Sequence, residues 1–285
     1  MRIVHSIADL ERELQQRRGA AESIALVPTL GNLHAGHVSL IRRARALARC
    51  VVVSVFVNPL QFGPNDDFER YPRTLDADAR LIEAEGVQLL FAPTVADMYP
   101  GGYPPATSVQ VAGALDSVLE GEFRPGHFAG VATVVNILFN RVRPDVAVFG
   151  EKDYQQLAVI RRMVVDLGLS VRIEGSPTLR DADGLALSSR NQYLQPAERA
   201  LAPQLQAVLR TIAQGLRDGR RDFDTLCAQP YAQLQESGFR PQYLAVRAPD
   251  LSPPDASARR FVVLAAAYLG NTRLIDNLSV NLDVQ

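Results

Sequence analysis

Short apolar runs alternate with stretches of helical periodicity through the first 177 residues. Residues 50–57 form a nearly continuous β-branched run, typical of a parallel strand buried on both faces. Further strands are expected over residues 24–27, 87–91, 145–149 and 171–173. Apolar spacings of three and four predict helices over residues 6–18, 38–48, 74–85, 115–119, 130–142 and 154–167. This alternation predicts an α/β fold with a doubly wound parallel sheet.

The pattern changes near Pro177. A stretch rich in Arg, Asp and Ser over residues 180–191 precedes a leucine stripe that predicts one long helix over residues 197–216. Another helix is expected over residues 223–236, where Pro230 should kink or split it. Strands are expected over residues 242–246, 261–266 and 272–275. We therefore predict two domains that share a cleft: an α/β domain over residues 1–177 and a smaller α+β domain over residues 178–285.

Composition narrows the class of protein. The 285 residues carry a net charge of −1, and because nucleic-acid binding usually requires a basic face, we expect no nucleic-acid partner. No signal peptide or membrane-spanning run is visible, so we expect no membrane association and a cytoplasmic location. Cys50 and Cys227 are expected to be buried free thiols.

The basic residues show one exception to a strong bias. Of 30 lysines and arginines, only Lys152 is a lysine. A lysine ammonium is a compact point charge whereas a guanidinium is a planar fork, so this position could require the ammonium. A stray lysine left by chance explains the same observation. Lys152 lies in Gly150-Glu-Lys-Asp153, between a predicted strand and a predicted helix, where a phosphate group could bind.

Two of the four histidines, His34 and His37, stand three residues apart where a predicted strand turns into a helix. Backbone N–H groups at such a helix N-terminus can bind phosphate, and two imidazoles could stabilise charge on a phosphoryl group. Local hydrogen bonding within the turn is the alternative. Metal binding is disfavoured because no nearby Cys, Asp or Glu completes a zinc-like set.

Two further segments carry polar groups suited to ligands. Gln61 follows the carboxyl end of the strand at residues 50–57, where ligands bind in open parallel sheets, although a surface turn explains the same residues. Its amide can both donate and accept hydrogen bonds from a small polar substrate. Ser188, Ser189 and Arg190 form a multi-donor anion site or, alternatively, a helix cap with a surface charge.

Seven ordered segments together resemble the pantoate–β-alanine ligases, a family of the HxGH nucleotidyltransferase superfamily. They are residues 28–37, 56–62, 71–74, 119–127, 149–156, 183–191 and 273–277. The resemblance implies a Rossmann-like nucleotide-binding domain with a C-terminal lid. It also implies ATP-dependent condensation of pantoate with β-alanine through a pantoyl adenylate, yielding pantothenate, AMP and pyrophosphate. The family uses Mg²⁺, is cytosolic and forms homodimers.

The same resemblance implies roles for individual residues. His34, His37 and Lys152 are the implied catalytic residues, with His37 as proton donor. Gln61 and Gln156 would bind pantoate, and Gln61 would also bind β-alanine. The implied ATP-binding residues are Leu30, Gly31, Asn32, Leu33, His34, Ala35, Gly36, His37, Gly150, Glu151, Lys152, Asp153, Leu179, Leu187, Ser188, Ser189 and Arg190.

Two departures from the family pattern concern methionines. Leu30 and Leu187 stand where the family usually has methionine, so we expect an altered fit rather than lost function. Asp76 and Asp78 are weak magnesium candidates, because phosphates and water are expected to supply most ligands. Another adenylyltransferase of the superfamily is the alternative function, and a non-catalytic nucleotide-binding module is a more distant one.

Overall fold

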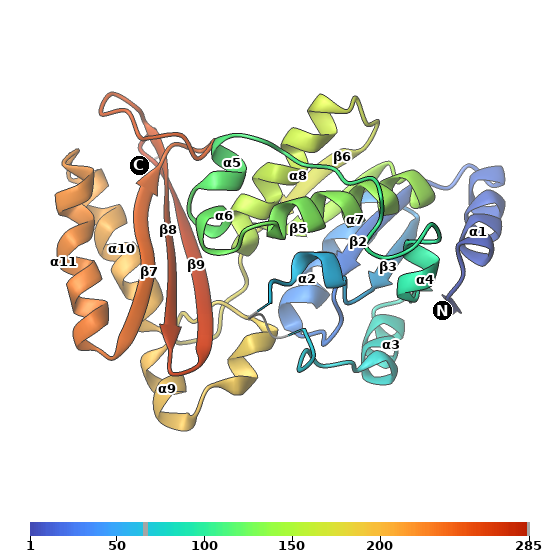
Figure 1. The fold of residues 1–285 in the computed structure, drawn as a ribbon, viewed down its shortest axis with the longest axis horizontal. Helices are drawn as coiled ribbons and strands as arrows, with labels where there is room; N and C mark the ends of the chain where they lie inside the picture. Colours follow the sequence, from blue (N-terminus) through green and yellow to red (C-terminus); the bar gives the residue numbers. More distant parts are fainter. Residues whose placement is uncertain (65–67, 284–285) are drawn as a thin grey trace. The chain divides into compact units, whose positions relative to one another are not determined.

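The computed structural model of the chain describes residues 1–64 and 68–283. Its contacts divide the chain into two compact units (Figure 1). Unit 1 comprises Met1–Glu151 and Gln156–Pro177, and unit 2 comprises Lys152–Gln155 and Thr178–Gln285. The short segment that contains the only lysine therefore belongs to the unit formed mainly by the C-terminal part of the chain.

Unit 1 is built on a six-stranded parallel sheet of order β1-β4-β3-β2-β5-β6. The strands are β1 (Arg2–Val4), β2 (Ile24–Thr29), β3 (Cys50–Val55), β4 (Leu89–Phe91), β5 (Val146–Gly150) and β6 (Arg172–Ser176). The chain winds outward from β2 to β4 and then crosses to the other side of β2 to form β5 and β6. The predicted doubly wound sheet is confirmed. The edge strand β1 was not predicted, because three residues carry too little periodicity.

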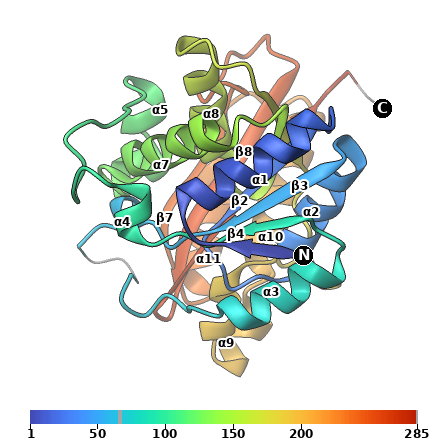
Figure 2. The same cartoon turned by 90° about the vertical axis from the view of Figure 1, so that its right-hand side faces the viewer.

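Helices cover both faces of this sheet. The helices in this part of the chain are α1 (Ile7–Gly19), α2 (Ala35–Leu47), α3 (Leu75–Ala84), α4 (Val95–Met98), α5 (Ala114–Ser117), α6 (Glu120–Phe123), α7 (His127–Val142) and α8 (Tyr154–Asp166). Alternate strand residues belong to different apolar clusters, since successive side chains point to opposite faces. Leu26 packs in the cluster of α1, α7 and α8, whereas Val27 packs in that of α2 and α3. These two groups of helices lie on opposite sides of the sheet (Figure 2).

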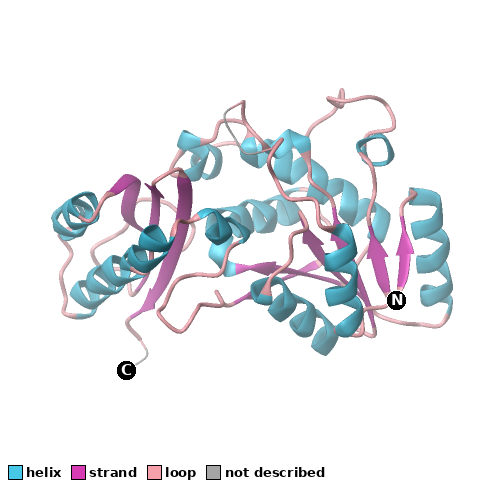
Figure 3. Cartoon of the chain, turned by 90° about the horizontal axis from the view of Figure 1, so that it is seen from below, coloured by secondary structure: helices cyan, strands magenta, loops and turns pink. Residues whose placement is uncertain are grey.

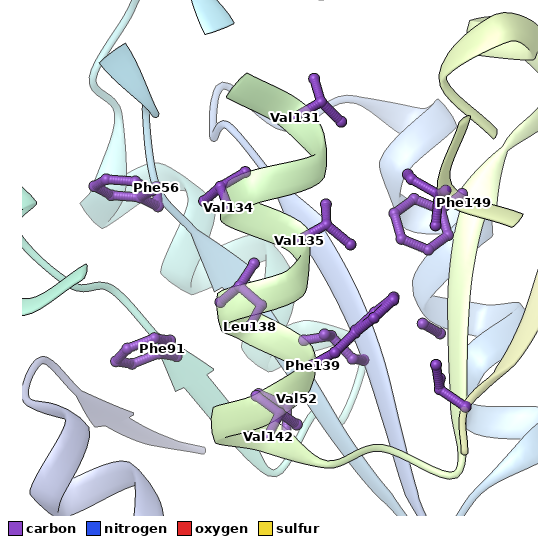
Figure 4. Close-up of a cluster of buried hydrophobic side chains, with 14 of the residues drawn as sticks. Val52, Phe56, Phe91, Val131, Val134, Val135, Leu138, Phe139, Val142 and Phe149 are labelled. Atoms are coloured by element: carbon purple, nitrogen blue, oxygen red, sulfur yellow. The ribbon is translucent and has the colours of Figure 1, made fainter. Parts of the chain in front are cut away.

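Helix α7 is the central element of the larger cluster. Val131, Val135 and Leu138 are at most 4% exposed and lie among aromatic side chains, including Phe56 and Phe149 (Figure 4). Burying each such side chain contributes about 1.5–3 kcal/mol. The helix begins three residues before the predicted position 130, because Gly126 adopts a φ of +79° and starts the helix there. This earlier start brings His127 into the first turn.

Unit 2 contains a three-stranded antiparallel sheet of order β7-β8-β9. Its strands are β7 (Phe239–Arg247), β8 (Arg260–Leu269) and β9 (Thr272–Asn281), each longer than predicted. Helices α10 (Gln204–Arg217) and α11 (Phe223–Glu236) pack against each other and against this sheet, and their apolar residues form its core (Figures 1 and 3). The predicted α+β character of this region is confirmed.

Two prolines bear on the predicted helices of unit 2: one breaks a predicted helix, and the other lies inside a helix that keeps its predicted bounds. The single helix predicted over residues 197–216 is two helices, α9 (Pro196–Leu201) and α10, because Pro203 between them lacks the N–H that would continue the ladder. The leucine stripe runs through the break, so periodicity alone concealed it. Conversely, Pro230 does not split α11, whose apolar face remains packed in the core.

Two further features of the described residues concern membrane-spanning helices and thiols. Among them, no helix combines the length and apolarity needed to cross a membrane. Cys50 and Cys227 are both buried and free, as predicted. Burial raises the pKa of the Cys50 thiol, and it raises the pKa of the Cys227 thiol to about 11.

Candidate active site

The two histidines cap the start of α2, immediately after β2. His34 Nδ1 accepts from the Gly36 N–H at 3.1 Å, and His37 Nδ1 accepts from the His34 N–H at 3.3 Å. Because a backbone N–H can only donate, each Nδ1 carries a lone pair and each neutral ring has its hydrogen on Nε2. The ring centroids are 4.2 Å apart. The turn thus combines a helix N-terminus with two Nε2–H donors, which suits developing negative charge.

A buried carboxylate holds the turn that precedes these histidines. Gly31 adopts a φ of +88°, and Asp78 accepts from the N–H groups of Asn32 at 3.0 Å and Leu33 at 2.8 Å. Thr74 also donates to Asp78, which is only 3% exposed. Both carboxylate oxygens are therefore engaged with the chain, which argues against Asp78 as a magnesium ligand. Sequence reasoning missed this structural role.

Gln61 lies in a single 3₁₀ turn, η1 (Pro59–Gln61), just past β3. Asn58 caps this turn: its Oδ1 accepts from Leu60 N at 3.3 Å and from the Tyr99 hydroxyl at 2.6 Å. Burial raises the pKa of the Tyr99 phenol, which keeps its proton available for that bond. Asn58 Nδ2 donates to Gln61 Oε1 at 3.3 Å and to the Gly130 carbonyl at 3.1 Å. The amide of Gln61 is thereby oriented from within unit 1.

The turns after β2 and β5 share one special position in the sheet. These strands pair directly, and the chain reverses its winding direction between them. In open α/β sheets, ligands bind outside the carboxyl ends of the strands at such a switch point. The histidine turn follows β2, and Gly150 and Glu151 end β5 and begin the next turn. Gln156 is half-buried in the first turn of α8, and among the described residues no hydrogen bond joins it to Gln61.

In unit 2, Lys152 is anchored through its main chain. Its carbonyl accepts from Asn277 Nδ2 on β9 at 2.8 Å, while its ammonium pairs with Asp153 at 3.6 Å. The side chain is 17% exposed, so the ammonium is partly shielded from solvent. Asn277 belongs to the segment at residues 273–277, whose place in the family pattern suggested no role for it.

Asp276, the neighbour of Asn277 on β9, anchors a hairpin in which Arg180 pairs with Ala186. Leu187 N donates to the Leu179 carbonyl at 2.9 Å, so the two residues predicted near the nucleotide pair directly. Arg180 in the same hairpin makes a bidentate ion pair with Asp276, with distances of 2.6 and 2.8 Å. Asp276 is 4% exposed. A single strand therefore holds both this hairpin and the Lys152 segment.

The Ser188–Arg190 run forms the start of a further 3₁₀ helix, η3 (Ser189–Tyr193). Ser188 Oγ caps it by accepting from Arg190 N at 3.3 Å. The helix packs against β9, and Asn191 donates to the Ala186 carbonyl at 3.0 Å, which ties the run to the hairpin. Ser188 is therefore a helix cap, which was the alternative to an anion site for this run. Ser188, Ser189 and Arg190 lie together at the start of the helix.

A cavity of about 600 Å³ lies elsewhere in unit 1. Residues of α7 and of the segment 98–109 line it, and none of the predicted site residues does. Tyr99 borders this cavity and also donates to Asn58, as described above. Among the described residues, no group of three or more His, Cys, Asp or Glu side chains could hold a metal ion.

A doubly wound parallel sheet with a histidine-capped helix at its switch point defines an α/β enzyme of the nucleotide-binding class. The family model described as pantoate-beta-alanine ligase matches residues 2–279. The chain belongs to the pantoate-beta-alanine ligase family and shares its activity.

Individual relatives agree with this assignment over nearly their whole length. The chain is 55% identical over 284 residues to a pantothenate synthetase of Pseudomonas putida, covering 99% of each chain. A crystal structure of pantothenate synthetase from Thermus thermophilus superposes with a TM-score of 0.91 at 47% identity, covering 98% of this chain and 99% of that one. The pantoate-beta-alanine ligase of Francisella tularensis, described in complex with beta-gamma ATP and beta-alanine, gives 0.80 at 33% identity, covering 100% and 99%.

Proposed function

We propose that the chain condenses pantoate with β-alanine in two steps, of which the first consumes ATP. In the first, a carboxylate oxygen of pantoate attacks the α-phosphorus of ATP, and the bond to the β-phosphate breaks to release pyrophosphate. In the second, the amine of β-alanine attacks the acyl carbon of the pantoyl adenylate. The carbon–nitrogen bond forms, the bond to AMP breaks, and the amine loses a proton.

The observation that carries this proposal is the histidine-capped turn at the sheet's switch point. We propose that the ATP-binding residues of unit 1 are Leu30 to His37 with Gly150 and Glu151, and that His34 and His37 contact the phosphates. Their Nε2–H groups would donate to oxygen atoms that gain charge as pyrophosphate leaves, with His37 as proton donor. The site needs no activated nucleophile, because the attacking group is supplied by the substrate.

The residues of unit 2 would serve the same nucleotide. We propose that Lys152, Asp153, Ser188, Ser189 and Arg190 bind its phosphates, and that the main chain of the paired Leu179 and Leu187 meets adenine and ribose. Mg²⁺ would be held mainly by phosphate oxygens and water, since the hard cation keeps much of its hydration. Asp78 supports this assignment of the Mg²⁺ ligands, because its carboxylate already accepts from the N–H groups of the histidine turn.

Pantoate would bind through Gln61 and Gln156, and β-alanine through Gln61. The Gln61 side chain supports this role, because it is 9% exposed and its Oε1 is already held by Asn58. Among the described residues, none accepts from its Nε2, so this donor remains available to a ligand hydroxyl or carboxylate.

We propose that the domains run over residues 1–177 and 178–285, that the second acts as a lid, and that the protein is a cytoplasmic homodimer with no nucleic-acid or membrane partner. Light scattering of the purified chain would measure the oligomeric state, and a monomer mass would contradict the dimer.

An assay of product release tests the proposed steps. With ATP and pantoate alone, we expect about one pyrophosphate per active site, whereas AMP should accumulate over many turnovers only when β-alanine is added. Release of AMP that requires a different acceptor would contradict the pantoate pathway and favour another adenylyltransferase. ATP binding without any pyrophosphate release would favour the non-catalytic module.

The variant Lys152→Arg tests, in the same assay, whether position 152 requires an ammonium group. The substitution preserves the charge but replaces a point ammonium with a planar fork, so we expect the pyrophosphate burst to slow by about 10²–10³-fold. Arg161→Lys, an exchange on α8 in the opposite direction, is the control and should leave the burst rate unchanged. Near-normal adenylation in Lys152→Arg would show that any positive charge suffices at this position.

A further inference from the structure

The main-chain carbonyl of Gln61 receives two side-chain donors from the segment that starts α7. His127 Nδ1 lies 2.8 Å from this oxygen, and an Nη atom of Arg124 lies 3.3 Å from it. Both bonds end on the backbone of the residue proposed to bind pantoate. They act on the peptide unit from which the Gln61 side chain projects.

The same two side chains also fix each other. Arg124 Nη1 lies 3.2 Å from His127 Nε2, and because a guanidinium can only donate, Nε2 carries the lone pair. The hydrogen is therefore on Nδ1, where the bond to the Gln61 carbonyl requires it. His127 thus has the opposite tautomer to the neutral forms of His34 and His37, whose Nδ1 atoms accept.

The local backbone makes this arrangement possible. A turn in which His127 N donates to the Arg124 carbonyl at 3.1 Å places the two side chains together. One turn further along, Gly130 lets the helix approach η1: a Cβ at this position would lie 2.2 Å from the Leu60 carbonyl oxygen and 2.7 Å from Gln61 N. The start of α7 is therefore docked directly against the turn that carries Gln61.

We propose that Arg124 and His127 are positioning residues that set the orientation of Gln61 through its main-chain carbonyl. This proposal rests on the proposed role of Gln61 in binding pantoate. With Oε1 held by Asn58 and the carbonyl held by Arg124 and His127, both ends of the residue are fixed. Its Nε2 donor is then presented to the substrate without an ordering cost at binding.

Replacements of His127 test this role. In His127→Leu the donor is lost at similar volume, and we expect the KM for pantoate to rise about 5- to 10-fold, as loss of one hydrogen bond allows. The KM for ATP should stay within about twofold. In His127→Asn the side-chain Nδ2 occupies the place of Nδ1, so the KM for pantoate should return to within about threefold of the wild-type value.

Arg124→Lys supplies an independent variant that leaves the helix start untouched. A lysine amine cannot bridge His127 and the Gln61 carbonyl as the guanidinium fork does, so this variant should also raise the KM for pantoate selectively. The proposal is overturned if His127→Leu and His127→Asn behave alike, or if the KM values for pantoate and ATP rise together. Poor folding of His127→Leu would leave the other two variants to decide.

Gln61→Ala separates this inference from the proposed site. If Gln61→Ala leaves the KM for pantoate unchanged, the assignment of Gln61 to pantoate is wrong and the positioning role falls with it. If Gln61→Ala raises that KM strongly while the His127 and Arg124 variants do not, pantoate binding by Gln61 stands and the positioning role alone is wrong.

Discussion

The two units hold their candidate ligand groups by different means. In unit 1, the groups lie in tight turns at strand ends, and side chains from separate helices hold the main chain of these turns: Asp78 of α3 holds the N–H groups of the histidine turn, and His127 of α7 holds the Gln61 carbonyl. These contacts follow from the parallel sheet, which brings the ends of β2 and β3 together. The geometry depends on small residues that permit close backbone approach.

In unit 2, adjacent side chains of one strand do this work. Asp276 holds Arg180 of the hairpin, and Asn277 holds the Lys152 carbonyl. An antiparallel strand offers its two faces to different neighbours, so consecutive residues can anchor two separate segments. Unit 1 should therefore be most sensitive to the space between backbone segments, and unit 2 to the loss of individual polar partners.

The largest expected effect comes from removing Arg180. Arg180→Met leaves the Asp276 carboxylate buried without its ion-pair partner, which typically costs about 3–5 kcal/mol. Hydrogen exchange followed peptide by peptide should show faster exchange in β8 and β9 and little change in β2 and β3. Arg42→Met is the matched control, because Arg42 makes a bidentate pair with Glu85 in unit 1 but at the surface.

The control should leave exchange in both units close to wild type, since exposed pairs contribute little. If Arg42→Met and Arg180→Met have equal effects, the buried ion pair is not what anchors the hairpin. If Arg180→Met accelerates exchange equally throughout the chain, the two units unfold together and the contrast between them disappears.

Adding one methyl group to unit 1 should have a smaller effect. In Gly130→Ala the new Cβ would overlap the Leu60 carbonyl, so α7 and η1 must separate, at a cost of about 1–3 kcal/mol. The KM for pantoate should rise with the loss of stability, because Gln61 moves with the turn. Urea unfolding and steady-state kinetics measure the two quantities.

Gly19→Ala provides the control for that substitution. A Cβ there meets nothing within 4 Å, and the residue ends α1, so the unfolding free energy should not fall. A Gly130→Ala variant as stable as Gly19→Ala, with an unchanged KM for pantoate, would show that unit 1 tolerates backbone displacement after all.

Periodicity was enough to predict the main elements but not their breaks. The run at residues 50–57 is a central strand because every side chain in it suits a buried sheet, and β3 occupies residues 50–55. The break at Pro203 was missed because the leucine stripe continues across it in the same phase. The sequence pattern shows which face of a helix is apolar. A break in the helical hydrogen bonds leaves that face unchanged, so the pattern does not reveal the break.

The sequence predicted candidate site residues where the residue type alone indicates the chemistry. Histidines at a helix start and a solitary lysine can be recognised in the sequence, although their ligand contacts remain predictions. The side chains that hold these turns could not be found in this way. Asp78 lies 46 and 45 residues from Asn32 and Leu33, whose N–H groups donate to it, and Asn277 lies 125 residues from Lys152. Such partners depend on strand order and helix docking, which a single sequence without a fold does not supply.

Each unit buries one free thiol, Cys50 in unit 1 and Cys227 in unit 2. Burial raises the pKa of Cys227 in unit 2 from its ordinary value of 9.0 to about 11. Between these values the folded state keeps a proton that the unfolded chain releases, so the unfolding free energy must fall as pH rises from about 9 to 11. Two units of pKa correspond to about 2.7 kcal/mol at full effect, and partial solvent access reduces our expectation to about 1–2 kcal/mol.

Cys227→Ala should remove this pH-dependent loss, so that the stability difference between wild type and variant narrows across the window. Urea unfolding at several pH values measures it, and the slope is independent of any constant cost of the substitution. Cys50→Ala makes the same test in unit 1, where burial also raises the thiol pKa. Identical slopes for wild type and both variants would mean that neither thiol is shielded from water. If the slope changes in only one variant, the two thiols differ in their shielding from water although both are buried.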